Sequence, residues 1–144
     1  NMALASMNRF CSKGFVNARK IYDNCMYYTG EMNLHPAEPN YLTESLSGGN
    51  AQKVIIAKWM TTDADIIIFD EPTKGIDVGA KAEIYRLMED LVAGGKAIIM
   101  VSSELPEVIG MSDRVVVMRE GKIMGFLNHD ELNEEVIMSF AMGG

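Results

Sequence analysis

The chain has 144 residues, of which 48% are apolar and 23% charged, and this composition suits one soluble globular domain with a real core. Its 20 acidic and 13 basic residues give a formal charge of −7, which argues against a nucleic-acid-binding surface. No apolar stretch approaches the roughly 20 residues that a membrane-spanning helix needs. The two cysteines, Cys11 and Cys25, fit no metal or redox spacing and favour a reducing compartment.

Residues 1–45 predict a small helical segment. Apolar residues recur at helical spacing over 4–11, and Gly14 is expected to end that helix. A second helix is predicted from residue 16 to about 30. The two prolines and the asparagine of 36–40 then indicate a loop.

Residues 46–144 alternate between strand and helix patterns. The unbroken apolar runs 66–69 and 97–101 are typical of strands buried on both faces of a parallel sheet. The remaining predictions are helices over 48–60, 78–92 and 104–111, a hairpin over 114–126 and a last helix capped by Asn133. Together these elements predict an α/β fold with a mainly parallel sheet flanked by helices.

Leu46-Ser47-Gly48-Gly49-Asn50 opens the predicted helix 48–60 with a hydroxyl and two glycines. The free N–H groups and the positive dipole end of a helix attract phosphate, and glycine lets an anion approach the backbone closely. An ordinary Ser-Gly-Gly turn before a helix is the alternative interpretation.

Asp70 and Glu71 follow the apolar run 66–69, and they are expected at the carboxyl end of a strand, where open α/β sheets bind their ligands. An aspartate there can hold Mg²⁺, directly or through water, because Mg²⁺ prefers a few carboxylates with water and phosphate. The adjacent glutamate can polarise an attacking water. The alternative is that two acids simply end a strand and face solvent.

Leu-Ser-Gly-Gly followed 24 residues later by Asp-Glu-Pro-Thr at the end of an apolar strand resembles the nucleotide-binding domain of ABC-type ATPases. The resemblance implies a partial P-loop NTPase fold, in which 1–45 belongs to the helical subdomain and 46–144 to the ATP-binding core. The signature motif would be 46–50, the Walker B strand 66–71, the D-loop 75–77 and the switch segment 101–104.

Asn50 stands where most members of the family have glutamine. Together with the segments 70–81 and 102–108, this residue indicates a subgroup of the family. These segments look like the C-terminal part of the second nucleotide-binding domain of the tandem ATPases that energise import of monosaccharides such as ribose, galactose and xylose. The implied partners are the N-terminal nucleotide-binding domain of the same polypeptide, a transmembrane sugar permease and, indirectly, a sugar-binding protein, with no nucleic acid. The implied location is peripheral, on the cytoplasmic side of the membrane.

The resemblance also implies a role for each motif residue. The signature residues Leu46, Ser47, Gly48, Gly49, Asn50 and Gln52 would bind ATP held by the partner domain, with the serine and glycines at its γ-phosphate. Asp70 would hold Mg²⁺, Glu71 would act on the attacking water, and Asp77 would link the two sites across the interface.

Ser103 occupies the position of the family's usual switch histidine. Serine is a shorter donor and carries no charge. The site built on this domain is therefore expected to hydrolyse ATP poorly. His35 and His129 lie in predicted loops, where an ordinary solvated role is expected.

No Gly-x-x-x-x-Gly-Lys-Ser/Thr string occurs, and Gly95-Lys96 is followed by alanine. The chain is therefore expected to be the part of the domain that follows the P-loop and, when isolated, to bind ATP and Mg²⁺ weakly and to be inactive. Its uncovered sheet edges and apolar faces are expected to cause self-association.

Two other function classes compete with this interpretation. A soluble ABC-type ATPase acting on DNA or ribosomes is disfavoured by the negative charge and the absence of coiled-coil heptads. A non-catalytic remnant or interaction module stays open.

Overall fold

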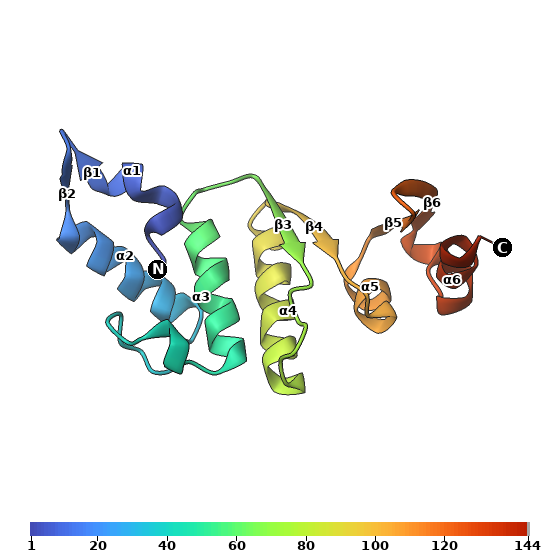
Figure 1. The fold of residues 1–144 in the computed structure, drawn as a ribbon, viewed down its shortest axis with the longest axis horizontal. Helices are drawn as coiled ribbons and strands as arrows, with labels where there is room; N and C mark the ends of the chain where they lie inside the picture. Colours follow the sequence, from blue (N-terminus) through green and yellow to red (C-terminus); the bar gives the residue numbers. More distant parts are fainter. Residues whose placement is uncertain (144) are drawn as a thin grey trace. The chain divides into compact units, whose positions relative to one another are not determined.

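The computed structural model describes residues 1–143, which form two compact units, one of residues 1–99 and one that starts at Met100. Figure 1 shows the order of the helices and strands along the chain. Among residues 1–143, none of the helices combines the length and the hydrophobicity that a membrane-spanning segment requires.

The first unit opens with short elements: η1 (Leu4–Ser6), α1 (Met7–Phe10), β1 (Cys11–Ser12) and β2 (Phe15–Val16). The prediction that Gly14 ends a helix is wrong, because Lys13 and Gly14 form the turn between two antiparallel strands. Both residues have a positive φ, of 50° and 84°, and this conformation suits a tight hairpin turn. The next helix begins at Ala18, because the Asn17 side chain accepts a hydrogen bond from the backbone N–H of Lys20.

Helices α2 (Ala18–Glu31) and α3 (Gly48–Met60), with η2 (Thr43–Ser45) between them, complete the helical part of this unit. The α3 bounds agree with the predicted range. Hydrogen bonds attach the N-terminal segment to Thr61 at the end of α3. The hydroxyl of Ser6 donates to Oγ1 of Thr61 over 2.8 Å, Arg9 donates to the Thr61 carbonyl over 2.6 Å, and Oγ1 of Thr61 lies 3.4 Å from the Met2 carbonyl. The helical segment 1–45 and α3 are therefore packed together.

The predicted strand–helix–strand alternation is confirmed by β3 (Ile66–Asp70), α4 (Val78–Ala93) and β4 (Ala97–Val101). β3 pairs with β4, and Figure 1 shows their arrows running in the same direction. The prediction that β3 is buried on both faces is wrong, because Ile66 and Ile68 are 59% and 67% exposed while Phe69 is buried. The side of β3 that carries the two isoleucines is therefore more than half exposed.

The second unit contains α5 (Leu105–Met111), β5 (Arg114–Arg119), β6 (Lys122–Asn128), η3 (His129–Glu131) and α6 (Glu134–Met142). The predicted hairpin is confirmed, since β5 and β6 pair antiparallel. Its core consists of Val115, Val117, Leu127 and Ile137. Asn133 caps α6 as predicted, because its side chain accepts from the backbone N–H of Val136 over 2.8 Å.

Candidate functional site

The predicted signature segment forms the start of α3. Ser47 is the N-cap residue, with extended backbone angles, and its side-chain oxygen accepts from the backbone N–H of Asn50 over 3.4 Å. Ser47 and Gly48 are exposed, whereas Gly49 is buried. The exposed serine and the first free N–H groups of a 13-residue helix can therefore meet an anion from solvent.

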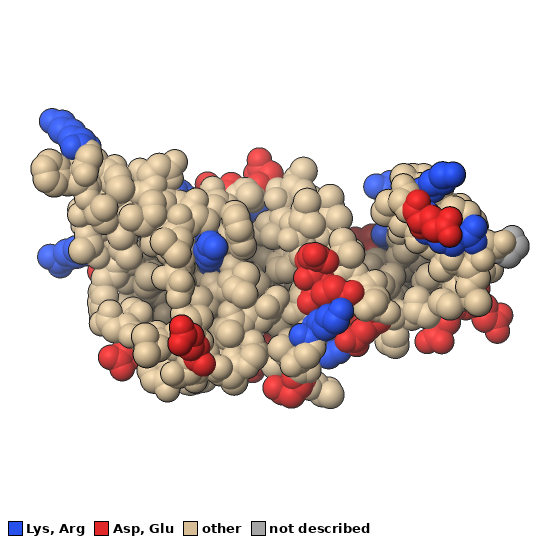
Figure 2. Space-filling model, in the orientation of Figure 1, with Lys and Arg blue, Asp and Glu red and all other residues tan. Residues whose placement is uncertain are grey.

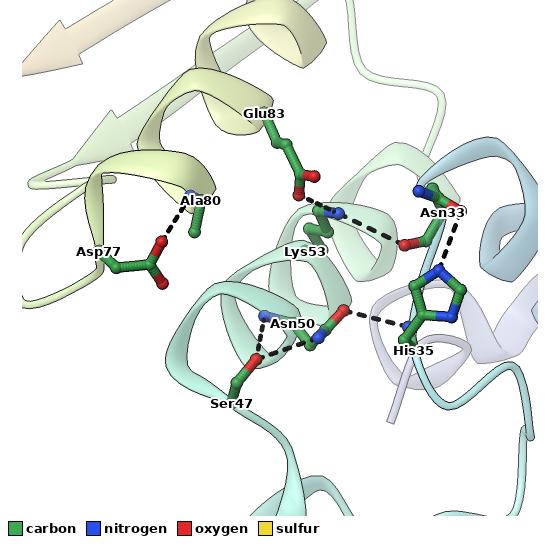
Figure 3. Close-up of polar contacts among 8 residues, drawn as sticks. All are labelled: Asn33, His35, Ser47, Asn50, Lys53, Asp77, Ala80 and Glu83. Carbon is green, nitrogen blue, oxygen red and sulfur yellow. Dashed lines mark hydrogen bonds and ion pairs between the residues drawn. The ribbon is translucent and has the colours of Figure 1, made fainter.

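Both polar atoms of the Asn50 side chain form hydrogen bonds within the protein. Its Nδ2 donates to Oγ of Ser47 over 3.0 Å, and its Oδ1 accepts from the backbone N–H of His35 over 3.1 Å (Figure 3). The helix-opening serine is thereby joined to the turn that follows α2. Leu46 and Gln52, the other two predicted signature residues, are half-buried.

The signature segment packs closely against the predicted D-loop segment and the start of α4. A Cβ added to Gly49 would lie 2.6 Å from Cβ of Ala80, and one added to Gly48 would lie 3.4 Å from Cγ2 of Ile76. Any side chain at residue 49 would therefore force the two helices apart. The structure thus brings the signature and D-loop segments, two regions predicted separately from the sequence, side by side.

Asp77 is the N-cap residue of α4. Its Oδ1 accepts from the backbone N–H of Ala80 over 2.9 Å, and the side chain is exposed (Figure 3). Gly75, two residues earlier, has φ +76°, a conformation that favours glycine. The turn and the cap together fix where Asp77 lies.

Asp70 is the last residue of β3 and is exposed, so the prediction of an acid at the carboxyl end of a strand is confirmed. Glu71 follows in the left-handed region, with φ 47°, which costs a non-glycine residue of order 1 kcal/mol. Pro72 and Thr73 behind it are fully buried, and the backbone N–H of Lys74 donates to the Glu71 carbonyl over 3.2 Å. The buried residues hold the turn, which keeps the Glu71 backbone in this conformation.

Lys53 forms an ion pair and a hydrogen bond that the sequence patterns did not predict. It is 7% exposed, and its Nζ lies 2.6 Å from the Glu83 carboxylate on α4 and 3.4 Å from the Asn33 carbonyl (Figure 3). One buried ammonium therefore joins α3 to α4 and to the 33–35 turn. The only indication in the sequence was a lysine on an otherwise apolar helix face. This does not predict an ion pair, because the apolar part of a lysine side chain can pack on an apolar surface while its ammonium stays in solvent.

Ser103 lies in the second unit, between β4 and α5, and is exposed. Its neighbour Ser102 fixes this turn, since the Ser102 hydroxyl oxygen accepts from the backbone N–H of Glu104 over 3.0 Å and its hydroxyl donates to the buried Glu107 carboxylate. The predicted switch position is therefore presented to solvent from an ordered turn.

His35 and His129 are exposed, as expected for solvated residues, and each ring also contacts one neighbour: Asn33 Oδ1 at 3.2 Å and the Ser112 carbonyl at 3.0 Å. The link that the sequence missed is the His35 backbone N–H, which bonds Asn50. A backbone donor belongs to every residue type except proline, so no residue pattern could reveal it.

Burial raises the pKa of the Cys25 thiol and of the Tyr28 phenol, both in α2. A raised thiol pKa lowers the thiolate fraction at neutral pH, so Cys25 is a poor nucleophile. Within the described residues no cluster of three or more His, Cys, Asp or Glu side chains could hold a metal alone. A single exposed carboxylate such as Asp70 still fits Mg²⁺, which takes its other ligands from phosphate and water.

The fold is that of part of an ABC-type ATP-binding cassette. The sequence profile of the ABC transporter family matches residues 7–74. Residues 7–74 therefore carry an ABC transporter domain. The chain is similar to the ribose import ATP-binding protein RbsA of Clostridium perfringens, at 48% identity over 99% of this chain, and to that of Halalkalibacterium halodurans, at 49% over 100%. It spans 29% of the length of each.

Solved structures agree on the fold. An ATP-binding cassette of an ABC transporter in its ADP conformation superimposes with a TM-score of 0.74 and 19% identity, covering 99% of this chain and 62% of that one. A dimeric bacterial ABC transporter cassette gives a TM-score of 0.68 at 21% identity, covering 82% and 51%.

Proposed function

We propose that this chain forms part of the ATPase that energises monosaccharide import by an ABC transporter. The observation that carries the proposal is the exposed Ser47-Gly48 start of α3, packed against the D-loop segment 75–77. Side-by-side placement lets both segments face the same partner body. The similarity to ribose import ATP-binding proteins supports ribose or a related sugar as cargo.

In this proposal ATP lies between the signature of this domain and the P-loop of a second nucleotide-binding domain. Ser47, Gly48 and Gly49 contact the γ-phosphate, with the rest of the signature in support. Phosphoryl transfer depends mainly on positioning and on stabilising charge, so dividing the donors between two bodies couples hydrolysis to their closure. Asp77 links the two sites across that interface.

Asp70 and Glu71 serve the ATP on the P-loop of their own domain. Asp70 would hold Mg²⁺, whose chemistry is to neutralise charge on the phosphates. Glu71 would orient and polarise the attacking water. The strained Glu71 backbone supports this role, because such conformations concentrate at functional sites.

The proposal assigns unequal activity to the two sites of the tandem protein. Ser103 replaces a histidine that could carry charge, so the site containing Glu71 hydrolyses poorly and the other site supplies most of the turnover. Glu71→Gln in the full-length protein is expected to lower transport-coupled ATPase much less than the matching change in the other domain. Equal losses would contradict the asymmetry, and no loss from either change would contradict the ATPase assignment.

The isolated 144-residue chain contains no P-loop string and is proposed to bind ATP weakly or not at all. Calorimetric titration with MgATP is expected to give no saturable heat. A stoichiometric complex with micromolar affinity would show that nucleotide affinity does not depend on the P-loop.

The proposed partners are a second nucleotide-binding domain, a transmembrane sugar permease and, through it, a sugar-binding protein, with this protein on the cytoplasmic side of the membrane. The net charge of −7 disfavours nucleic acid as an alternative partner. On the face drawn in Figure 2 the Lys and Arg side chains are scattered and form no continuous basic band. Both observations favour the transporter over a DNA- or ribosome-directed ATPase.

A further inference from the structure

We infer that Asn50 is a positioning residue that sets the direction in which the Ser47 hydroxyl donates its proton. The inference rests on the proposed function, in which Ser47 meets the γ-phosphate of ATP. It departs from the expectation that Asn50 itself binds nucleotide.

The orientation of the Asn50 amide is determined by the His35 backbone. A backbone N–H can only donate, so the Asn50 atom 3.1 Å from it has to be the carbonyl oxygen Oδ1. The other end of the amide, Nδ2, therefore faces Ser47 and donates to it over 3.0 Å. His35 thus acts through its main chain, whatever its ring does.

Both acceptor positions of the Ser47 oxygen are taken by Asn50, one by Nδ2 at 3.0 Å and one by the backbone N–H at 3.4 Å. A hydroxyl has two acceptor positions and one proton. The proton of Ser47 must then point away from Asn50, and Ser47 is exposed at the start of α3. A phosphate oxygen arriving at this helix end meets a hydroxyl that is already turned to donate.

The 33–35 turn that orients Asn50 is itself held from α3. The ammonium of Lys53, one helical turn beyond Asn50, donates to the Asn33 carbonyl over 3.4 Å and pairs with Glu83 at 2.6 Å. Figure 3 shows the two contacts from α3 reaching the same turn. The His35 N–H is therefore a fixed reference for the Asn50 amide.

The test is a double-mutant cycle in the full-length protein that contains this chain, with Ser47→Ala, Asn50→Ala and the double variant. If Asn50 acts through Ser47, Asn50→Ala lowers kcat about tenfold, which corresponds to one oriented hydrogen bond, and changes KM for MgATP little. In the Ser47→Ala background the same change has almost no further effect. Full additivity of the two losses overturns the inference.

Asn50→Asp separates positioning from folding. The carboxylate has nearly the same shape but only accepts, so the Ser47 hydroxyl turns inward to donate to it. A negative charge in the first turn of a helix favours the fold, so a merely structural role predicts unchanged activity and an equal or higher unfolding temperature. The inference predicts at least a tenfold loss of kcat at an undiminished unfolding temperature.

The charge of the new carboxylate is controlled in two ways. Asn40→Asp, at an exposed loop position of the same unit, adds the same charge and is expected to leave kcat unchanged. Asn50→Asp in the Ser47→Ala background is expected to add little, whereas repulsion of ATP by the carboxylate would add its full effect there. That full effect would overturn the inference.

The cycle also distinguishes the inference from the proposed function. If Ser47→Ala alone leaves ATPase unchanged, the proposed role of the signature is wrong and the inference falls with it. If Ser47→Ala lowers kcat and Asn50→Ala does not, the proposed function stands and only the inference is overturned.

Discussion

The two candidate turns of the first unit are held in place by different means. At the start of α3, Ser47 Oγ accepts hydrogen bonds from the side-chain amide and the backbone N–H of Asn50, and Gly49 is packed against Ala80. At the end of β3, the Glu71 backbone lies in the left-handed region, and the buried Pro72 that follows it keeps the turn in place.

Because the two turns are held differently, substitutions in them are expected to affect stability and activity in different ways. The first turn depends on space at Gly49, where a change affects the fold, and on polar partners at Ser47, where a change can affect the site with little effect on the fold. The second turn carries backbone strain that is independent of the carboxylate, so stability and activity at Glu71 can be changed separately. The predictions below test this contrast.

The largest expected effect is at Gly49. Gly49→Ala places a methyl group 2.6 Å from the Cβ of Ala80, and such overpacking is expected to lower the free energy of unfolding by about 1–3 kcal/mol. Denaturant unfolding of the 144-residue chain measures it. Gly30→Ala is the control, because this α2 glycine has open space around it and alanine there is expected to stabilise by up to about 1 kcal/mol.

A second variant identifies the cause of the Gly49→Ala loss. Ala80→Gly removes the opposing methyl group, so combining it with Gly49→Ala is expected to cost less than the sum of the single changes. Simple additivity would show that the close approach of α3 and α4 is not what requires glycine at residue 49.

How far each turn could be predicted from the sequence follows from what holds it. The α3 start at Gly48 was predictable because serine ahead of glycines is a local cap signal, and the β3 end at Asp70 because an apolar run stops at an acid. The positive φ of Glu71 was not predictable, because glutamate is not among the residue types that favour the left-handed region.

Two further misses have equally physical causes. The β1–β2 hairpin consists of two-residue strands, which are too short to show a period of two. The apolar run of β3 predicted burial on both faces, yet Ile66 and Ile68 are exposed. The composition of a strand shows that its apolar side chains favour burial, but it does not show which other residues pack against them.

A gain in stability is expected at the strained turn. Glu71→Gly removes the Cβ that disfavours a φ of 47°, so the free energy of unfolding of the 144-residue chain is expected to rise by about 1 kcal/mol. Glu71→Gln keeps the strain and is expected to change stability by less than about 0.5 kcal/mol. If both variants behave alike, the backbone conformation of Glu71 costs nothing and the contrast between the two turns fails.

The strand that leads to this turn gives a smaller effect on stability. Ile68 is 67% exposed, so Ile68→Lys is expected to change the free energy of unfolding by no more than about 0.5 kcal/mol. The same change is expected to reduce the self-association predicted for the chain, measured as the weight-average mass in sedimentation at high concentration. A wild-type chain that stays monomeric under those conditions would contradict self-association.

The smallest expected effect is at the cap of α3. Ser47→Gly removes the hydroxyl but keeps a residue that tolerates the N-cap backbone, so it is expected to cost only a few tenths of a kcal/mol in unfolding free energy, whereas Ser47→Ala costs about 1 kcal/mol. ATPase of the full-length protein should nonetheless fall by the same factor in both variants, because both lack the hydroxyl. Activity that follows stability instead, with Ser47→Gly close to wild type, would mean that Ser47 serves the helix and not the nucleotide. The start of α3 would then be a helix cap without a direct part in the chemistry.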